Sequence, residues 1–295
     1  MAVGERVAAV ARPKQKAWVR EIKGLPWPAI IIIGALLFVA VAAPLVSPHL
    51  PYQVDLPNRL KPPMWEVGGS AANVIGTDTL GRDLLTRIYY GARVSLLVAV
   101  VCTGLAGLIG YILGVTAGYY GGMYAAVMMR IVDSIIAVPT ILLAIVFAMT
   151  MGPSMGTVIL AISSTLWVRF ARMLRGETLR VMKEDYILQA RVAGCSPPHT
   201  MLIHIVPNVF NIFMVIFSLD IGAVILFEAA LSFLGAGIPP PTPSWGQMIS
   251  EGRGYITSAW WIAFFPGLAL ALTVFAFNSF GDWLRDRLDP RLRQL

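Results

Sequence analysis

Long apolar runs separated by short polar passages dominate the chain. Six of these runs are candidates for membrane-spanning helices: Pro28–Val46, Ser95–Gly118, Val127–Met149, Met155–Val168, Val209–Phe233 and Ala259–Phe280. A helix needs about 20 predominantly apolar residues to cross the hydrocarbon core of a bilayer. The fourth run is short by this standard, so we expect its helix to continue toward Arg172. The pattern predicts an all-α integral membrane protein with six transmembrane helices.

Composition agrees with this class. Apolar residues make up 57% of the chain and charged residues 13%, and the mean hydropathy is +0.72. An ordinary soluble domain has roughly 25% charged residues. The two cysteines, Cys102 and Cys195, form neither a disulfide framework nor a metal-ligand spacing. We therefore expect no metal site in this chain.

Lysine and arginine are distributed unequally between the two predicted membrane faces. Most of the 23 Lys and Arg residues lie in the N-terminal tail, in the 169–191 passage and in the C-terminal tail. The positive-inside rule places that face in the cytoplasm, together with both termini. The net charge of +7 follows from this bias and from anionic lipid, so we expect no nucleic-acid partner.

The predicted organisation follows from these spans. It comprises a cytoplasmic N-tail at residues 1–27, a first transmembrane helix at 28–46, an extracytoplasmic segment at 47–93, a transmembrane core at 94–281 with a cytoplasmic loop at 176–208, and a cytoplasmic C-tail at 282–295. The small residues AVAA before Pro44 also resemble the end of a signal peptide. The apolar run is longer than the usual apolar region of about 7 to 15 residues, which favours an uncleaved helix.

Three acidic residues fall inside the apolar runs: Asp133, Asp220 and Glu228. A charged side chain at the centre of a transmembrane helix costs at least about 2.5 kcal/mol, so it usually faces a cavity or a partner. Asp133 and Asp220 are compatible with a translocation path or gate and, equally, with an interhelical hydrogen bond. Glu228 lies near the outer end of its run, where we expect contact with solvent.

Small residues and prolines in the runs indicate packing and helix breaks. Gly110, Gly114 and Gly118 recur every four residues, which predicts a face along which another helix packs closely. Pro139 and Pro207 can kink a helix or end its regular hydrogen bonding.

Catalytic and nucleotide-binding motifs are weak. GPSMG at residues 152–156 matches G-x-S-x-G, but a nucleophile elbow follows a strand, and apolar helical runs flank this turn. No G-x-x-x-x-G-K-[ST] loop occurs, so the chain does not bind ATP through a P-loop. We expect no catalytic residue, no bound cofactor, and nucleotide energy supplied by another subunit.

The polar passage YILQARVAGCSPPHTMLIHIVPN, residues 186–208, interrupts two apolar runs on the predicted cytoplasmic face. Asp185 is predicted to cap a short helix through Ala193, and Gly194 suits the left-handed position after its end. Ser196 and Pro197 are a typical start for a second helix, which runs into Pro207. Three of its apolar residues are expected to face the membrane: Met201, Leu202 and Ile205. The first helix suits docking on a soluble partner, although an amphipathic interfacial helix fits equally well.

This passage is similar to the EAA loop of ABC importer permeases. Ala190, Gly194 and Pro207 match the second alanine, the glycine and the final proline of that pattern, whereas Leu188 and Gln189 replace its glutamate and first alanine. The resemblance implies that the loop docks on an ATPase through these residues: Asp185, Tyr186, Leu188, Gln189, Ala190, Arg191, Gly194 and Pro207.

Two further stretches narrow the resemblance. GTDTLGRDLLTRIYYGARVSL (Gly76–Leu96) and EAALSFLGAGIPPPTPSWGQMI (Glu228–Ile249) resemble signature segments of the C-type permease of dipeptide, oligopeptide and nickel ABC importers. Asp78, Arg82 and Asp83 are expected to form a hydrogen-bonded structure under a binding protein or, equally, a turn and helix cap. The candidates for an extracytoplasmic motif and gate are Gly76, Asp78, Gly81, Arg82, Asp83, Glu228, Ser232, Phe233 and Gly235.

The resemblance implies a type I ABC importer permease with six transmembrane helices in a bacterial or archaeal cytoplasmic (inner) membrane. Its expected partners are a second, related permease in a heterodimer, two ABC ATPases that use ATP and Mg²⁺, a solute-binding protein and membrane lipid. It would move di- or oligopeptides inward by alternating access, and nickel or another small solute is the alternative substrate. An ATP-independent secondary transporter and an intramembrane hydrolase are the other function classes.

Overall fold

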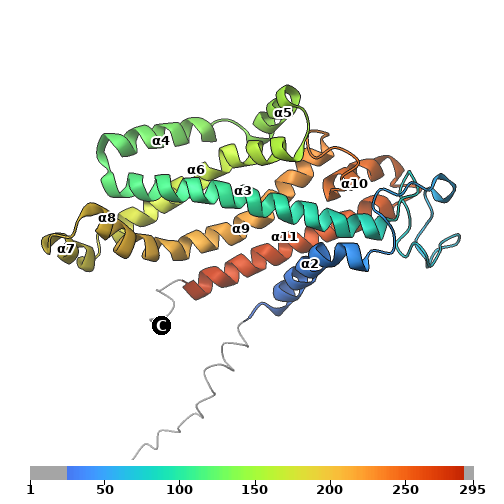
Figure 1. Ribbon diagram of the computed structural model, residues 1–295, viewed down its shortest axis with the longest axis horizontal. Coiled ribbons are helices and arrows are strands. Elements are labelled where there is room, and N and C mark those ends of the chain that lie inside the picture. Colours follow the sequence, from blue (N-terminus) through green and yellow to red (C-terminus); the bar gives the residue numbers. More distant parts are fainter. Residues whose placement is uncertain (1–24, 289–295) are drawn as a thin grey trace, which may run out of the picture.

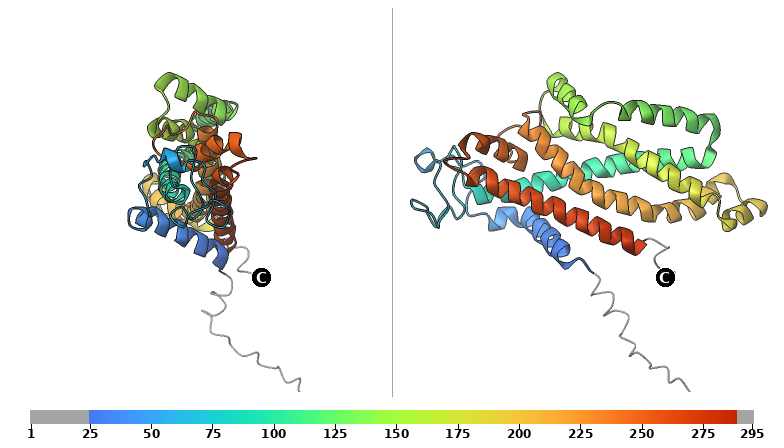
Figure 2. Two further views of the ribbon diagram at one scale, coloured as in Figure 1. Left: turned by 90° about the vertical axis from the view of Figure 1, so that its right-hand side faces the viewer. Right: turned by 180° about the vertical axis from the view of Figure 1, so that it is seen from behind.

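The computed structural model describes residues 25–288, and within that range the regular elements are all helical. The long helices run side by side along the long axis of the molecule (Figures 1 and 2): α2 (Trp27–Val46), α3 (Leu84–Tyr120), α6 (Met155–Val181), α9 (Val206–Phe233) and α11 (Trp261–Leu288). Each lies in a stretch long and apolar enough to cross a membrane. The all-α membrane fold predicted from the sequence is confirmed.

The third predicted span is broken. In place of one helix over Val127–Met149, the chain forms α4 (Gly122–Ile136) and α5 (Thr140–Met151), which are bent by 78° relative to each other. Pro139 lies immediately before α5 with an extended ψ of 122°. Proline cannot donate an intrahelical hydrogen bond and disfavours helical backbone in the preceding residue, which explains the break. Counting the bent pair as one crossing gives up to six spans.

Two helices extend more than ten residues beyond their apolar runs. α3 begins at Leu84 rather than Ser95, because Asp83 caps it by accepting a hydrogen bond from the backbone N–H of Thr86 at 2.8 Å. At 1.5 Å per residue its 37 residues span about 55 Å, well beyond a hydrocarbon core of about 30 Å. α6 likewise continues past Val168 to Val181. α3 thus connects the two ends of the molecule.

The glycine stripe on α3 is the contact surface for α6, as predicted. A methyl group at Gly110 would lie 2.5 Å from the carbonyl oxygen of Trp167. At Gly114 and Gly118 it would lie 2.6 Å from Ala171 and Thr178 of the same helix. Only a residue without a side chain lets the two backbones approach this closely.

The two ends of the helical bundle carry different elements (Figure 1). One end, called here the α10 end, holds α10 (Trp245–Gly252), η3 (Arg253–Tyr255) and the 47–83 segment with η1 (Leu56–Asn58). The other, the α7 end, holds α7 (Asp185–Val192), α8 (Pro197–His199) and the π-helical turn η2 (Thr200–Ile205).

The ends of the described chain face the α7 end of the bundle. The start of α2 and the end of α11 both point toward it (Figure 1). α11 continues to Leu288, so the part of the chain predicted as a tail from residue 282 begins as helix. Residues 1–24 and 289–295, which include most of both predicted tails, lie outside the described residues.

Candidate functional site

The end of α7 is a regular glycine-terminated helix cap. Gly194 has φ +80°, its N–H donates to the carbonyl of Arg191 at 3.0 Å, and the N–H of Cys195 donates to the carbonyl of Ala190 at 3.1 Å. These two hydrogen bonds define a Schellman motif, in which glycine takes the left-handed position. The left-handed position predicted for Gly194 at the end of the helix is confirmed. A methyl group there would meet nothing within 4 Å, so the space beside Gly194 is open.

Two finer predictions about this loop are wrong, and a third is confirmed. Asp185 is the first residue of α7 and does not cap it, because Glu184 holds the N-cap position without a side-chain hydrogen bond. Ser196 holds the N-cap position of α8 and Pro197 follows as its first residue, as predicted, although the Ser196 hydroxyl makes no capping hydrogen bond. Ile205 is fully buried inside the bundle and does not face the membrane, whereas Leu202 is 61% exposed, which is compatible with the predicted contact with lipid. The π-helical turn η2 changes the spacing of side chains between these two residues.

α7 is anchored on one side and open on the other. Ile187 is fully buried against the bundle, whereas Leu188 and Val192 are 48% and 90% exposed. These two residues are four apart, so they lie on the same face of the helix. Gln189 is also exposed and Ala190 is partly buried. An apolar face at the tip of the molecule is typical of a docking surface.

Tyr186 lies beside this face and packs against the π-helical turn. Its ring centroid is 6.4 Å from that of His204. Partial burial raises the pKa of the Tyr186 phenol, and the negative charge of the nearby Glu184 carboxylate raises it further. The phenol therefore stays protonated at neutral pH. Pro207 lies in the first turn of α9, where a backbone N–H would have no intrahelical acceptor, so proline breaks no helical hydrogen bond there.

Arg191 connects α7 to the end of α3. Its guanidinium lies 5.8 Å from the ring centroid of Tyr119, and its Nη2 is 3.2 Å from the sulfur of Met182. A cation over an aromatic face is attracted by the ring quadrupole. The side chain is thus directed toward its own bundle, and it holds α7 against α3 and the end of α6.

At the α10 end, the GTDTLGRD motif forms a buried cluster of four charged residues, called here the outer charge cluster: Asp78, Arg82, Arg87 and Glu251. Asp78 and Arg87 are almost fully buried and Arg82 nearly so. Asp78 pairs with Arg82 at 2.6 Å and also with Arg87. Glu251 of α10 accepts from Arg82 at 3.1 Å and from Arg87 at 2.9 Å. Two carboxylates and two guanidiniums balance, so the cluster is neutral as a whole.

The rest of the motif is a tight turn followed by a helix cap. Gly81 has φ +76°, and a side chain there would overlap the carbonyl of Asp55. Gly76 has φ +89°, and a methyl group would lie 2.6 Å from the carbonyl oxygen of Lys61. Asp83 caps α3. The geometry contains both the hydrogen-bonded Asp78–Arg82 structure and the turn with its helix cap, and a position under a binding protein stays a prediction.

Sequence reasoning missed Arg87 and Glu251 as members of the cluster. Arg87 is buried in the first turn of α3, one turn from the capping residue Asp83. Glu251 is distant in sequence, and it is brought in only because α10 folds back against α3 and α9. Neither residue has a local sequence signal that indicates burial.

Glu228 is fully buried, so the expected contact with solvent is wrong. One carboxylate oxygen accepts from the hydroxyl of Ser95 at 3.0 Å and the other from Ser232 at 2.8 Å. Because Ser95 belongs to α3, the carboxylate joins α3 to α9 inside the bundle. Phe233 lies under the guanidinium of Arg253 at 5.5 Å from the ring centroid.

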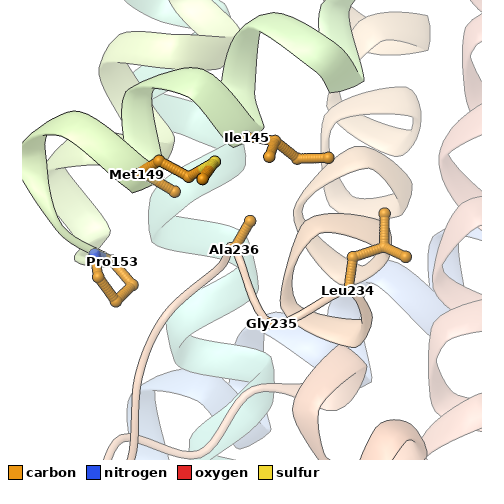
Figure 3. Close-up of a pocket in the computed structure, with 7 residues that line it drawn as sticks. Ile145, Met149, Pro153, Leu234, Gly235 and Ala236 are labelled. Atoms are coloured by element: carbon orange, nitrogen blue, oxygen red, sulfur yellow. The ribbon is translucent and has the colours of Figure 1, made fainter.

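Gly235 lines a shallow apolar groove of about 230 Å³ at the α10 end (Figure 3). α5 and the turn after it form one wall, and the chain that follows α9 forms the other. The lining residues are Ile145, Ala148, Met149, Pro153, Leu234, Gly235 and Ala236. None carries a charged side chain, so the groove offers no ionic partner to a charged solute.

The two remaining acidic residues each pair with an arginine of α6. Asp133 on α4 lies 2.6 Å from Arg172, and both side chains are about half exposed. Asp220 on α9 is fully buried and lies 2.6 Å from Arg169. Both are interhelical ion pairs, and the Asp133 pair is also the hydrogen bond of the second interpretation, whereas the Asp220 carboxylate accepts no hydrogen bond among the described residues.

Ser154, the central residue of GPSMG, has a structural role. Its Oγ accepts a hydrogen bond from the backbone N–H of Thr157 at 3.1 Å and so caps α6. His199 and His204 lie at the α7 end, far from the start of α6 (Figure 1). This geometry does not form a hydrolase site.

Comparison with known proteins identifies the family. Residues 110–294, more than half of the chain, match the family described as binding-protein-dependent transport system inner membrane component. The chain is 39% identical over 292 residues to the dipeptide transport system permease protein DppC of Bacillus subtilis, covering 97% of this chain and 89% of that protein. It is 43% identical over 265 residues to the DppC of Escherichia coli K12, covering 90% and 88%.

A third relative is the probable D,D-dipeptide transport system permease protein DdpC of Escherichia coli K12, 37% identical and matched over 99% of this chain and 98% of that protein. With its apolar helices, the chain is a multi-pass transport subunit of the inner membrane. The match of residues 110–294 to the family and the match of at least 90% of the chain to each of these permeases lead to the same assignment. The chain belongs to the family of inner membrane components of binding-protein-dependent transport systems.

Proposed function

We propose that this chain is the C-type permease subunit of an ATP-driven importer that moves di- or oligopeptides into the cell. Transport systems of this family work with a solute-binding protein and an ATPase. Here the chain would pair with a second, related permease, and two ATPases would bind and hydrolyse ATP with Mg²⁺. In this proposal the nucleotide sites belong to the ATPases, and the chain is expected to bind no cofactor of its own.

The open face of α7 carries this proposal. Leu188 and Val192 form an exposed apolar surface on a short helix that is held to the bundle by Ile187 and Arg191. A rigidly anchored helix with an open apolar face suits insertion into a groove on another protein. Docking there would cover Ala190 and the open space beside Gly194, and movement of the ATPases would then pull on α3, α6 and α9.

The orientation follows from the same surface. If α7 meets the ATPases, the α7 end is cytoplasmic and the α10 end faces the solute-binding protein. The start of α2 and the end of α11 then lie on the cytoplasmic side, in agreement with the distribution of lysine and arginine. Peptide as the substrate is supported by three relatives that are named as dipeptide or D,D-dipeptide permeases.

Reconstitution tests the proposal. The chain would be purified with its partner permease and two ATPases, placed in liposomes, and supplied with the liganded solute-binding protein. We expect uptake of a radiolabelled dipeptide that requires ATP and the binding protein. Uptake of Ni²⁺ in place of peptide would overturn the substrate, and uptake by the permease pair without ATPases would overturn the mechanism.

A further inference from the structure

An ion pair lies deep in the bundle, away from both ends. Arg169 is at the middle of α6 (Met155–Val181), and Asp220 is at the middle of α9 (Val206–Phe233). The neighbouring residue Phe170 packs against Gly110 of α3. Gly110 lies ten residues before Tyr120, the last residue of α3, or about 15 Å at 1.5 Å per residue. Arg169, which the sequence placed at the start of the cytoplasmic 169–191 passage, is therefore held inside the bundle beside the apolar middle of α9.

The two partners differ in exposure. Asp220 is fully buried, whereas the side chain of Arg169 is 55% exposed on the surface of this chain. Nη1 of Arg169 approaches Oδ1 of Asp220 to 2.6 Å, but the approach is not aligned for a hydrogen bond. Neither carboxylate oxygen has a hydrogen-bond donor among residues 25–288. Asp220 thus holds the guanidinium electrostatically and leaves most of its N–H donors free.

A half-exposed guanidinium at this depth cannot face lipid. Charged side chains within membrane spans face the bundle interior, a partner or a water-filled path, because hydrocarbon offers them no hydrogen bonds. Arginines near helix ends can extend to the membrane surface, but the contact with Asp220 keeps Arg169 at mid-helix. If the chain pairs with a second permease as proposed, the exposed side of Arg169 would face the space between the two subunits.

We propose that Arg169 is a transient binding site for the carboxylate of the peptide on its way through the membrane. The inference rests on the proposed function, because a terminal carboxylate is the one anionic group that peptides share whatever their side chains. A guanidinium binds a carboxylate through two parallel hydrogen bonds. Arg169 would make this contact, and Asp220 would act as the positioning residue behind it.

The buried aspartate also explains how such a site releases its ligand. A transport path needs sites that bind well enough to admit the solute and weakly enough to let it leave. An unpaired arginine in an apolar setting would hold a carboxylate tightly. Asp220 neutralises most of that charge, so the carboxylate competes with a permanent counter-ion.

Arg172 provides a matched control, one helical turn away. It is 49% exposed and is also paired with an aspartate at 2.6 Å, but its partner Asp133 is 61% exposed. Asp133 therefore offers its own negative charge at the surface beside Arg172. A peptide carboxylate would be repelled there, so Arg172 is not expected to bind it.

The test uses the complete transporter in liposomes, with binding-protein-stimulated ATP hydrolysis and dipeptide uptake measured together. Arg169→Gln is expected to lower the peptides moved per ATP at least tenfold while hydrolysis stays stimulated, and Arg169→Lys is expected to recover part of the loss. Arg172→Gln should leave the ratio within twofold of wild type. An unchanged ratio in Arg169→Gln would overturn the proposal. Absence of peptide uptake in the wild-type complex would instead overturn the proposed function.

A charge swap separates substrate binding from a purely structural ion pair. Arg169→Asp with Asp220→Arg keeps two opposite charges in place but presents a carboxylate to the path. We expect a complex that assembles and does not transport, whereas recovered uptake would show that only the ion pair matters. Loss of the partner permease from purified Arg169→Gln complexes would assign Arg169 to the subunit interface and would also overturn the proposal.

Discussion

The outer charge cluster makes the sharpest prediction about stability. Asp78 accepts hydrogen bonds from the backbone N–H groups of Leu80 and Arg82, and it pairs with the side chains of Arg82 and Arg87. In Asp78→Asn, one oxygen still serves the backbone, but an amide NH₂ group faces the two guanidiniums. The cluster then holds two guanidiniums but only one carboxylate, so one positive charge is left without a counter-charge in a buried site.

The magnitude follows from burial. Asp78 is fully buried and Arg87 is 1% exposed, so solvent cannot replace the lost charge. Removing one partner of a buried ion pair typically costs about 3–5 kcal/mol. Since each kcal/mol shifts the midpoint of unfolding by about 2–4 °C in a protein of this size class, Tm is expected to fall by about 6–20 °C.

Thermal unfolding of the purified complex in detergent, followed by intrinsic fluorescence, measures this shift. Glu177→Gln is the matched control, because Glu177 pairs with Arg180 three residues later at the surface of α6. Such a pair contributes only about 0.2–0.5 kcal/mol, and Tm should change by at most about 2 °C. A Tm for Asp78→Asn within 2 °C of wild type would refute the view that the motif is a buried charge-balanced turn.

Two further predictions concern packing and orientation. Gly110→Leu should sharply reduce the amount of folded complex on size-exclusion chromatography, because even a methyl group there would lie 2.5 Å from the carbonyl oxygen of Trp167. Gly104→Leu on the same helix is the control and should be tolerated, because a methyl group at Gly104 meets nothing within 4 Å. Equal yields of the two variants would contradict the packing of α3 on α6. In a chain lacking Cys102 and Cys195, Ser196→Cys should react with an impermeant thiol reagent only from the cytoplasm and Val67→Cys only from outside, and the reverse pattern would invert the topology.

Sequence periodicity predicted the spans, since a run of apolar residues has few alternatives to a helix in a membrane. It was less accurate at helix ends. The cap on α3 depends on Asp83, which lies well before the apolar run, and the break between α4 and α5 depends on the backbone before Pro139. Both are local effects that hydropathy does not report.

The candidate site was predictable where local geometry determines it. Gly194 could be assigned because a helix followed by glycine has a well-defined termination. Burial of Glu228 and the role of Glu251 could not be predicted, because each depends on helices that are distant in sequence. For Glu228 the distant partner is Ser95 of α3, and for Glu251 the partners are Arg82 and Arg87. The position of Arg169 directly after an apolar run indicated only the orientation of the chain in the membrane, and not the ion pair with Asp220.

The most direct test of docking through α7 is ATP hydrolysis by the assembled transporter carrying Ala190→Trp. Ala190 is partly buried on the helix that presents Leu188 and Val192, so an indole there would obstruct a groove that receives α7. We expect the variant to insert into the membrane normally and to lose stimulation of ATP hydrolysis by the liganded binding protein, while Val67→Trp at the α10 end inserts equally well. Normal stimulation in Ala190→Trp would contradict the assignment of α7 as the docking element.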